Sequence, residues 1–161
     1  MPDYISNTSP LQYLHQLGQL HLLPALVKHV IVPQAVAAEL AAGREQGLNL
    51  PDLSALDWVS IRQPVSAPAL PLITDLGPGE TEVLMLALEL PDSIVILDDG
   101  LARWVAEMRG LQLIGTLGIL LDAKRAGLIP AVSPLLDQLQ ALRFFVSAET
   151  RAAVLELASE G

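Results

Sequence analysis

The sequence predicts a single α/β domain built on a mostly parallel sheet. Short apolar runs of strand character alternate with longer helical segments, an order that is typical of parallel sheets with helical crossovers. The chain has 161 residues, which suffice for one domain with a sizeable core. Hydrophobic residues make up 52% of it, yet no apolar stretch reaches the roughly 18 residues that a membrane-spanning helix needs.

Strand and helix signals alternate regularly in the first half of the chain. Strands are expected at residues 4–6, 29–32 and 58–61. The helix after the first strand has Ser9 as its expected N-cap and Pro10 at its first helical position, where the missing N–H of proline costs nothing. The helix after the second strand begins at Pro33 and reads PQAVAAELAA. Residues 62–79 carry four prolines and two glycines, so we expect them to be mostly loop.

The second half of the chain continues the alternation and then becomes wholly helical. Strands are expected at residues 93–97 and 111–114, with helices at residues 79–90, 99–109 and 115–127. Residues 130–161 are expected to form a C-terminal helical extension with two helices, the second capped by Ser147. One broad apolar face of this extension is supplied by Leu135, Leu136, Leu139 and Leu142. We expect part of that face to contact a partner or another copy of the chain; alternatively, all of it packs on the sheet.

The chain is strongly acidic and contains no cysteine. Its net charge of −9 repels nucleic acid, whose phosphates dominate such binding, unless a metal ion or a local basic patch offsets the repulsion. The acidic surface is otherwise suited to a protein partner or to solubility. The absence of cysteine excludes disulfides and fits a reducing compartment. Because the stretch MPDYISNTSP also lacks the basic and apolar parts of a signal peptide, we expect a cytoplasmic protein without membrane association.

Two polar residues follow strands at the same edge of the predicted sheet. Asn7 ends the first strand, and Asp98 follows the apolar run SIVIL. Ligands of open α/β sheets bind outside the carboxyl ends of the strands, near the point where the strand order reverses. If the first and fourth strands are neighbours at that point, Asn7 and Asp98 lie side by side. Asp99 follows directly and is expected to cap the next helix.

Helical periodicity singles out two glutamates. Glu39 falls within the apolar stripe of its helix, where a carboxylate is costly unless something pairs with it. Alternatively, Glu39 lies at the edge of that stripe and reaches water. Glu80 lies on the face of its helix opposite the exposed line of Glu82 and Glu89, although the helix dipole alone would explain an acid in the first turn.

A rim that collects these side chains is unfavourable without a counter-ion. Two carboxylates about 4 Å apart repel by roughly 4 kcal/mol at an effective dielectric constant near 20. A bound divalent cation turns this repulsion into attraction, and ligands that are all oxygen favour Mg²⁺ or Mn²⁺ over zinc. The candidate metal ligands are Asn7, Glu39, Glu80 and Asp98, with Asp99 close by.

The stretches that carry these residues resemble the PIN-domain superfamily of metal-dependent ribonucleases, and within it the VapC-like group of prokaryotic toxin homologues. The resemblance covers roughly residues 4–130 and is carried by SNTSPL, VIVPQAVAAEL, LGPGETEVLMLA and VILDDGLARWVAEMRGLQLIGTLGILLDAKRAGLI. It implies a three-layer α/β/α sandwich around a short, mostly parallel sheet. We therefore expect residues 1–161 to form a single PIN-like domain.

The resemblance also implies roles for individual residues. The catalytic set would be Asn7, Glu39, Glu80, Asp98 and Asp99. Its Mg²⁺ or Mn²⁺ ions would activate water and neutralise charge on the scissile phosphate. Thr8 or Thr116 would be a polar neighbour of the metal. PIN nucleases usually carry aspartate where this chain has Asn7, although asparagine is familiar in this subgroup.

Other patterns indicate less. LGPGETE follows a proline-rich segment and not a strand, so it is no phosphate-binding glycine loop. The three histidines are spaced wrongly for paired zinc ligands on one helix, and the chain has no G-x-S-x-G motif. A basic rim near the site or plain solvated surface would account equally for Arg103, Arg109, Lys124 and Arg125.

Two classes of function remain open from the sequence. The first is a metal-dependent endoribonuclease that acts on single-stranded or structured RNA, either alone or as the toxin that a small antitoxin protein restrains. The second is a catalytically weakened PIN-fold binding or scaffold protein that acts through protein–protein contacts. In both cases the high apolar content and the acidic charge favour a homo-oligomer, a protein partner or both.

Overall fold

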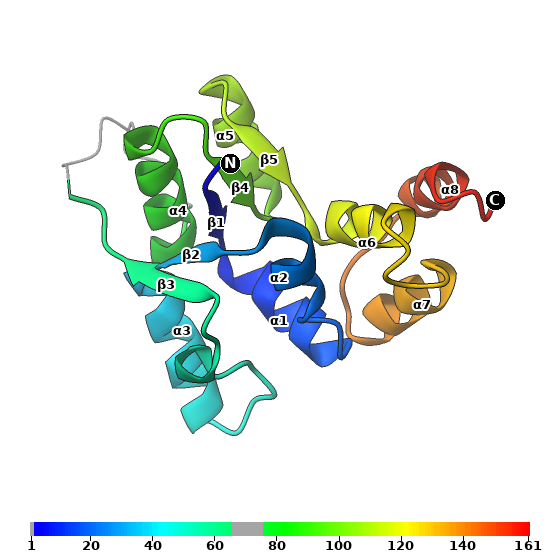
Figure 1. Ribbon diagram of the computed structural model, residues 1–161, viewed down its shortest axis with the longest axis horizontal. Helices are drawn as coiled ribbons and strands as arrows, with labels where there is room; N and C mark the ends of the chain where they lie inside the picture. The colour runs from blue at the N-terminus through cyan, green and yellow to red at the C-terminus, as the bar shows by residue number, and fades with distance from the viewer. Residues whose placement is uncertain (1, 66–75) are drawn as a thin grey trace.

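The centre of the molecule is a five-stranded sheet in which every neighbouring pair of strands is parallel. The computed structural model describes residues 2–65 and 76–161. Its strands are β1 (Tyr4–Ser6), β2 (Val30–Pro33), β3 (Val59–Arg62), β4 (Ile94–Ile96) and β5 (Gln112–Ile114). Their order in the sheet is β3-β2-β1-β4-β5, so the direction of winding reverses between β1 and β4 (Figure 1). The predicted parallel sheet and the predicted pairing of the first and fourth strands are both confirmed.

Helices cover the sheet in two groups. The helices are α1 (Thr8–Gln16), α2 (Leu22–Val27), α3 (Gln34–Glu45), α4 (Pro78–Glu89), α5 (Gly100–Met108), α6 (Thr116–Arg125), α7 (Ser133–Ala141) and α8 (Ala148–Leu157). Helix α4 packs on β1, β2 and β4 and contacts α3 and α5. Helix α6 packs on β5 and contacts α1, α2 and α8. The sheet is therefore the middle layer of an α/β/α sandwich, with α6, α7 and α8 gathered beyond one edge (Figure 1).

The start of α1 differs from the predicted one. Asn7 is the N-cap, with φ −80° and ψ 177°, and Thr8 is the first helical residue. Ser9 therefore lies inside the first turn, and its hydroxyl donates to a distant carboxylate at Asp98. The prediction that Ser9 caps the helix was wrong, because three consecutive polar residues left the position of the cap ambiguous.

Other boundaries shift by one to three residues. Pro33 ends β2 and is the N-cap of α3, which extends to Glu45. The side chain of Pro33 makes no capping hydrogen bond. Glu82 of α4 caps α3 instead, because its Oε1 accepts from the main-chain N–H of Ala35 at 2.9 Å. Glu82 is thus half-buried and not part of an exposed line. Of the predicted loop, residues 66–75 lie outside the described residues.

Two short elements escaped prediction. Helix α2 has only six residues, LLPALV, too few to show a helical period, and its proline weakens the pattern further. A turn of 3-10 helix at Leu53–Ala55 begins at Asp52, whose side chain accepts from the N–H of Ser54. Both elements are fixed by tertiary packing: Leu22, Leu23 and Leu53 belong to the buried core.

The C-terminal helices pack into the same core as the sheet. Leu135, Leu136 and Leu139 are at most 6% exposed, so the apolar face of α7 is occupied within the chain. Leu142, the fourth residue of this face, is only partly buried, so whether part of the face serves a partner stays a prediction. The predicted cap of α8 is confirmed, since the Ser147 hydroxyl accepts from the N–H of Thr150 at 3.1 Å. Across residues 2–65 and 76–161 no helix is long and apolar enough to cross a membrane.

Candidate active site

The site begins where β1 and β4 end side by side. Ser6 pairs with Ile96 in the parallel register, and the N–H of Asn7 donates to the carbonyl of Ile96 at 2.9 Å. Asp98 follows two residues beyond Ile96, after the fully buried Leu97. The fold thus brings Asn7 and Asp98 to the same crevice, at the point where the strand order reverses.

The side chain of Asn7 is buried without a partner. The residue is 3% exposed, and its Oδ1 accepts no hydrogen bond from any described residue. Although Asn7 is the N-cap of α1, its side chain makes no capping hydrogen bond, so the side chain does not stabilise the start of this helix. A buried acceptor without a donor costs about 1–3 kcal/mol, and such an oxygen calls for a specific explanation.

Thr8 and Glu39 lie on one side of Asn7. The Thr8 hydroxyl donates to Glu39 Oε2 at 2.6 Å, linking the start of α1 to the middle of α3. Glu39 is exposed, whereas Val36, Leu40 and Gly43 are the buried residues of α3. The placement of Glu39 in a core-facing stripe was therefore wrong, and its alternative at the edge of the stripe is correct. From that edge its carboxylate still reaches the site.

Gly79 leaves room for two oxygens of the site. A Cβ built on Gly79 would lie 2.9 Å from Glu39 Oε1 and 3.2 Å from Asn7 Oδ1. Both oxygens are therefore within about the same short distance of one point on the buried first turn of α4. Sequence reasoning missed Gly79. The available signal was a glycine at the second position of a helix, where glycine is otherwise a poor choice.

Asp98 lies on the other side of Asn7 and is held by three donors. Its Oδ1 accepts from the main-chain N–H of Thr116 at 2.8 Å. Its Oδ2 accepts from the hydroxyls of Thr116 at 2.7 Å and Ser9 at 2.9 Å. Thr116 is fully buried at the start of α6. The triplet Asn7-Thr8-Ser9 thus spans the site, because Thr8 donates a hydrogen bond to Glu39 and Ser9 donates one to Asp98.

The remaining two predicted residues lie at helix starts. Asp99 is exposed and caps α5, since its Oδ2 accepts from the N–H of Ala102 at 2.9 Å. Glu80, half-buried in the first turn of α4, folds back so that its Oε2 lies 2.6 Å from the place of a Cβ on Gly77. Over the described ranges, no three His, Asp or Glu side chains gather as closely as a metal-binding group does.

Among the residues considered for a basic rim, Arg103 lies next to Asp98. Its Nη1 donates to the carbonyl of Leu97 at 2.9 Å. A Cβ on Gly115 would lie 2.9 Å from the same nitrogen and 2.8 Å from Asp98 Oδ1, so the guanidinium and the carboxylate face each other across this glycine. Lys124 pairs with Glu160 and Arg125 with Asp122, away from the site.

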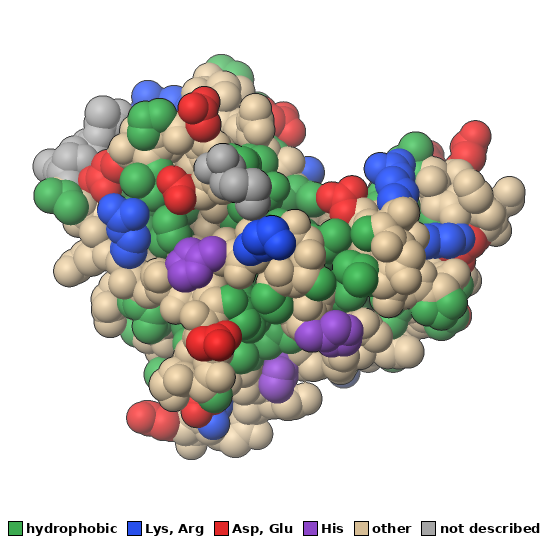
Figure 2. All heavy atoms as spheres, viewed as in Figure 1, with side chains coloured by type: hydrophobic (Ala, Val, Ile, Leu, Met, Phe, Trp, Pro, Cys, Tyr) green, Lys and Arg blue, Asp and Glu red, His purple; other side chains and the backbone are tan. Residues whose placement is uncertain are grey.

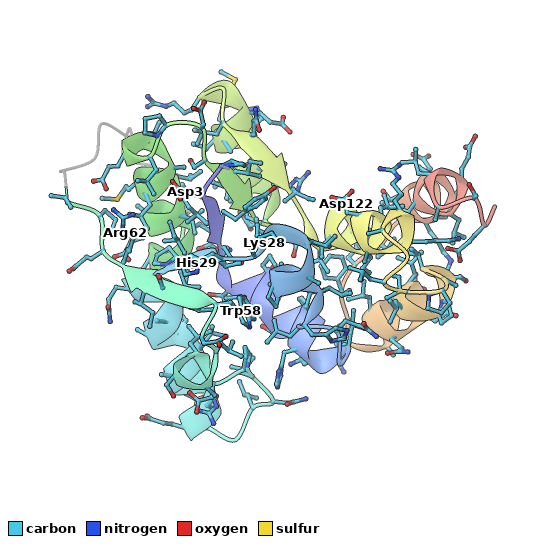
Figure 3. The ribbon with its side chains drawn as sticks, in the orientation of Figure 1. Asp3, Lys28, His29, Trp58, Arg62 and Asp122 are labelled. Carbon is cyan, nitrogen blue, oxygen red and sulfur yellow. The ribbon has the colours of Figure 1, made fainter. Side chains whose placement is uncertain are left out.

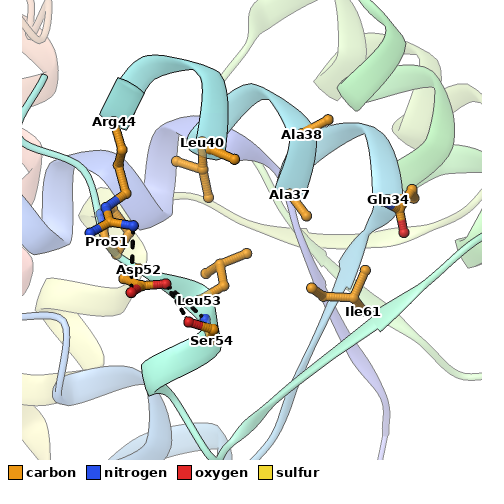
Figure 4. Close-up of a pocket in the computed structure, with 11 residues that line it drawn as sticks. Gln34, Ala37, Ala38, Leu40, Arg44, Pro51, Asp52, Leu53, Ser54 and Ile61 are labelled. Carbon is orange, nitrogen blue, oxygen red and sulfur yellow. Dashed lines mark hydrogen bonds and ion pairs between the residues drawn. The ribbon is translucent and has the colours of Figure 1, made fainter. Parts of the chain in front are cut away.

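Two surface hollows differ in whether a predicted site residue lines them. One of about 540 Å³ opens beside Asp98 and Arg103, between β5, α6 and the Phe144–Phe145 segment. Another of about 300 Å³ lies between α3 and residues 51–54 (Figure 4) and includes none of the predicted site residues. In the latter, hydrogen bonds from Ser54, together with Arg44 at 3.4 Å, hold the pKa of Asp52 below its usual range.

The donor set of the site fits a hard divalent cation. Asn7, Glu39 and Asp98 present oxygens only, with hydroxyl oxygens of Thr8, Ser9 and Thr116 around them. The unpartnered Oδ1 of Asn7 is the acceptor that such an ion would satisfy. No nitrogen or sulfur ligand of the kind that zinc prefers lies among these contacts.

The parallel order and the oxygen-lined crevice at its reversal point define a class of α/β proteins that bind ligands at the carboxyl end of the sheet. Within this class the chain belongs to the PIN-domain family, because the family model described as PIN domain (DUF3368) matches residues 3–160. A search of curated proteins found no match.

A solved structure supports the same fold. The chain is similar to a PilT N-terminus domain protein from the hyperthermophilic archaeon Sulfolobus solfataricus P2, with a TM-score of 0.55 and 18% sequence identity. The match covers 74% of this chain and 92% of that protein. At this identity the likeness shows the fold alone, which agrees with the predicted α/β/α sandwich.

Proposed function

We propose that this chain is a metal-dependent endoribonuclease that hydrolyses RNA phosphodiester bonds at the carboxyl end of its sheet. The observation that carries the proposal is Asn7 Oδ1, which is buried, accepts no hydrogen bond from the described residues, and faces the same point as Glu39 Oε1. An oxygen left without a donor beside a carboxylate is suited to a cation. Membership in the PIN family, a nuclease fold, supports the same function.

The protein would contribute position and charge. Thr8 and Ser9 fix Glu39 and Asp98 through their hydroxyls, so both carboxylates are oriented before any substrate arrives. Asn7, Glu39 and Asp98, with Glu80 nearby on α4, would hold Mg²⁺ or Mn²⁺, which supplies an activated water and neutralises the phosphate. Asp99 would act through the helix cap that it forms.

A second candidate function is binding without catalysis. The observation that favours it is also Asn7, a neutral amide at the strand end where a carboxylate would add to the charge that attracts metal. A weakly metal-binding PIN domain would act as a scaffold through protein contacts. The two functions differ in whether RNA is cut.

The VapC-like resemblance extends the first proposal to a toxin that a small antitoxin protein restrains. The acidic surface and the exposed apolar side chains of α5, Trp104 and Met108, would suit such a partner or a second copy of the chain. A small gene directly upstream, whose product copurifies with this chain, would support this role.

Cleavage of a labelled single-stranded RNA in Mn²⁺ or Mg²⁺ tests the nuclease proposal. We expect cleavage that EDTA abolishes and that Glu39→Gln lowers about 100-fold, because the loss of a metal-site group typically costs 10–100-fold. Glu107→Gln on the exposed face of α5 is the matched control and should cleave normally. The proposal fails if no RNA is cut in either metal, or if Glu39→Gln cuts as fast as the wild type.

A further inference from the structure

The hollow beside Asp98 carries features that the metal site does not use. Its lining includes Arg103, Leu117, Thr150, Phe144 and Phe145. A second hollow of about 320 Å³ is lined by the same two phenylalanines and by Arg143. The Arg143–Phe145 segment thus forms a ridge between two hollows, one of which reaches the proposed active site. Figure 2 shows the molecule notched between the α5–β5 side and the group of α6 and α8.

The two phenylalanines on the ridge have different roles. Phe144 is partly buried and packs edge-on against Tyr13 of α1, with ring centroids 5.0 Å apart and an interplanar angle of 83°. Phe145 is 86% exposed. Phe144 therefore anchors the segment to the body of the protein, and this anchor presents the ring of Phe145 to solvent. The ring of Phe145 is thus available to stack on a planar group that enters the hollow.

Arg143 occupies a position that glycine would fill better. Its φ is +69°, directly after the C-cap Leu142 of α7, and the N–H of Phe144 donates to the carbonyl of Leu139. Helices that end in this way usually place glycine at that position. Across the described residues Arg143 makes no ion pair, whereas Arg151, Arg125 and Lys124 do. The backbone conformation therefore does not account for the arginine, although the dipole of α7 favours a positive charge at its C-terminal end.

We propose that Arg103, Phe145 and Arg143 form a track for single-stranded RNA that leads into the site at Asp98, with an unpaired base stacked on Phe145. This inference rests on the proposed function and names how the substrate is held. Stacking on an exposed ring accepts any unpaired base. Arg103 lines one of the two hollows that Phe145 lines and Arg143 lines the other, so each hollow offers a positive charge to a phosphate. The track also answers the repulsion that a net charge of −9 imposes on RNA, since it places local positive charge along the path.

Binding can be measured without cleavage by fluorescence anisotropy, with labelled oligo(A) and oligo(U) decamers and Ca²⁺ in place of Mg²⁺. We expect Phe145→Ala to weaken oligo(A) binding about five-fold or more and to reduce the preference for adenine, which stacks more strongly than uracil. Trp104→Ala is the matched control, an exposed aromatic, 57% exposed, that lines neither hollow. It should bind both decamers as the wild type does.

Arg143→Gly removes the charge without harm to the fold, because glycine accepts the positive φ. We expect it to weaken binding a few-fold and to lower the dependence on salt by about one counterion. Its control is Lys28→Gly, which removes one charge at another residue with positive φ (+68°). Lys28 lies just before the amino end of β2 (Figure 3), whereas the proposed site lies at the carboxyl ends of the strands, so this change should affect binding little.

The outcomes separate this inference from the function on which it rests. If the wild type binds RNA but Phe145→Ala and Arg143→Gly bind equally well, the track is wrong while cleavage still decides the nuclease proposal. If Lys28→Gly weakens binding as much as Arg143→Gly, the attraction is only the overall charge, and the track is again wrong. If the wild type binds neither decamer, the track is wrong, and the cleavage experiment alone decides the nuclease proposal.

Discussion

Two polar regions of the molecule differ in their hydrogen bonding. Both carboxylate oxygens of Glu160 accept hydrogen bonds, whereas the amide oxygen of Asn7 accepts none from the described residues. Glu160 follows α8 and links it to α6 and to the start of α7. Its Oε2 accepts from the N–H of Val132 at 2.8 Å and from Lys124 Nζ at 2.9 Å, and its Oε1 accepts from the N–H of Ser133 at 3.0 Å. Asn7 Oδ1 is more deeply buried and accepts nothing from the described residues.

The difference separates structure from function. At Glu160 both oxygens satisfy the N–H groups at the start of α7, which helices always leave without a partner inside the helix. This carboxylate is therefore a helix cap supplied from a distance, as Glu82 is for α3. At Asn7 the fold leaves a buried oxygen without a donor and gathers further oxygens around it. Such an oxygen lowers the stability of the fold until a group from outside the polypeptide binds it.

The largest effect should come from Asp98, which belongs to the site but is bound as firmly as Glu160. We expect Asp98→Asn to lower RNA cleavage by about 100-fold or more. It should also destabilise the fold by about 1–3 kcal/mol, because an amide N–H would face donors of Thr116 or Ser9. Asp99→Asn is the control, since asparagine caps helices as well as aspartate does. Lost activity in Asp99→Asn with normal stability would show that Asp99 is catalytic.

Gly79→Ala should sharpen the comparison by separating stability from metal binding. Alanine favours a helix over glycine by up to about 1 kcal/mol. Its Cβ, however, would lie 2.9 Å from Glu39 Oε1 and 3.2 Å from both Asn7 Oδ1 and Val36 Cγ2, so the two oxygens must shift away from it. We expect Mn²⁺ affinity, measured by calorimetry, to fall about 10-fold while the melting temperature of the metal-free protein is kept. Unchanged affinity would mean that the two oxygens do not share a cation.

Glu160→Gln should affect stability alone, and its effect should depend on pH. The N–H of Val132, then Lys124 and the N–H of Ser133, lower the pKa of Glu160 to about 2. A carboxylate with a lowered pKa in the folded state contributes stability above its unfolded pKa, and that contribution disappears as the pH falls toward 2. We expect the variant to melt earlier than the wild type at pH 7, and the two melting temperatures to converge in acid. A constant difference across this range would contradict the assigned hydrogen bonds.

The sequence predicted the sheet well because its strands are short apolar runs that alternate with helices. It also predicted that Asn7 and Asp98 follow neighbouring strands at the same end of the sheet, since that depends only on strand order and on where the strands end. It misplaced Glu39, because the periodicity of α3 alone does not show which side of that helix the neighbouring α4 covers. It missed Gly79 and the roles of Ser9 and Glu82, which depend on side-chain contacts between elements distant in sequence.

The smallest but most selective effects concern Asn7 itself. Asn7→Asp adds a carboxylate to the rim, so it should lower the melting temperature of the metal-free protein slightly and tighten Mn²⁺ binding. Asn7→Leu fills a similar volume without an oxygen. It should leave the metal-free protein as stable as before or more so, by up to about 1–3 kcal/mol, because an unsatisfied buried acceptor is removed.

The rise in melting temperature on addition of Mn²⁺, compared among the wild type, Asn7→Asp and Asn7→Leu, tests the proposed metal site most directly. A ligand that binds only the folded state stabilises it by RT ln(1 + [L]/Kd), so the rise reports affinity. We predict the largest rise for Asn7→Asp, an intermediate one for the wild type and little or none for Asn7→Leu. Equal rises in all three proteins, or none in any, would contradict a metal bound at Asn7.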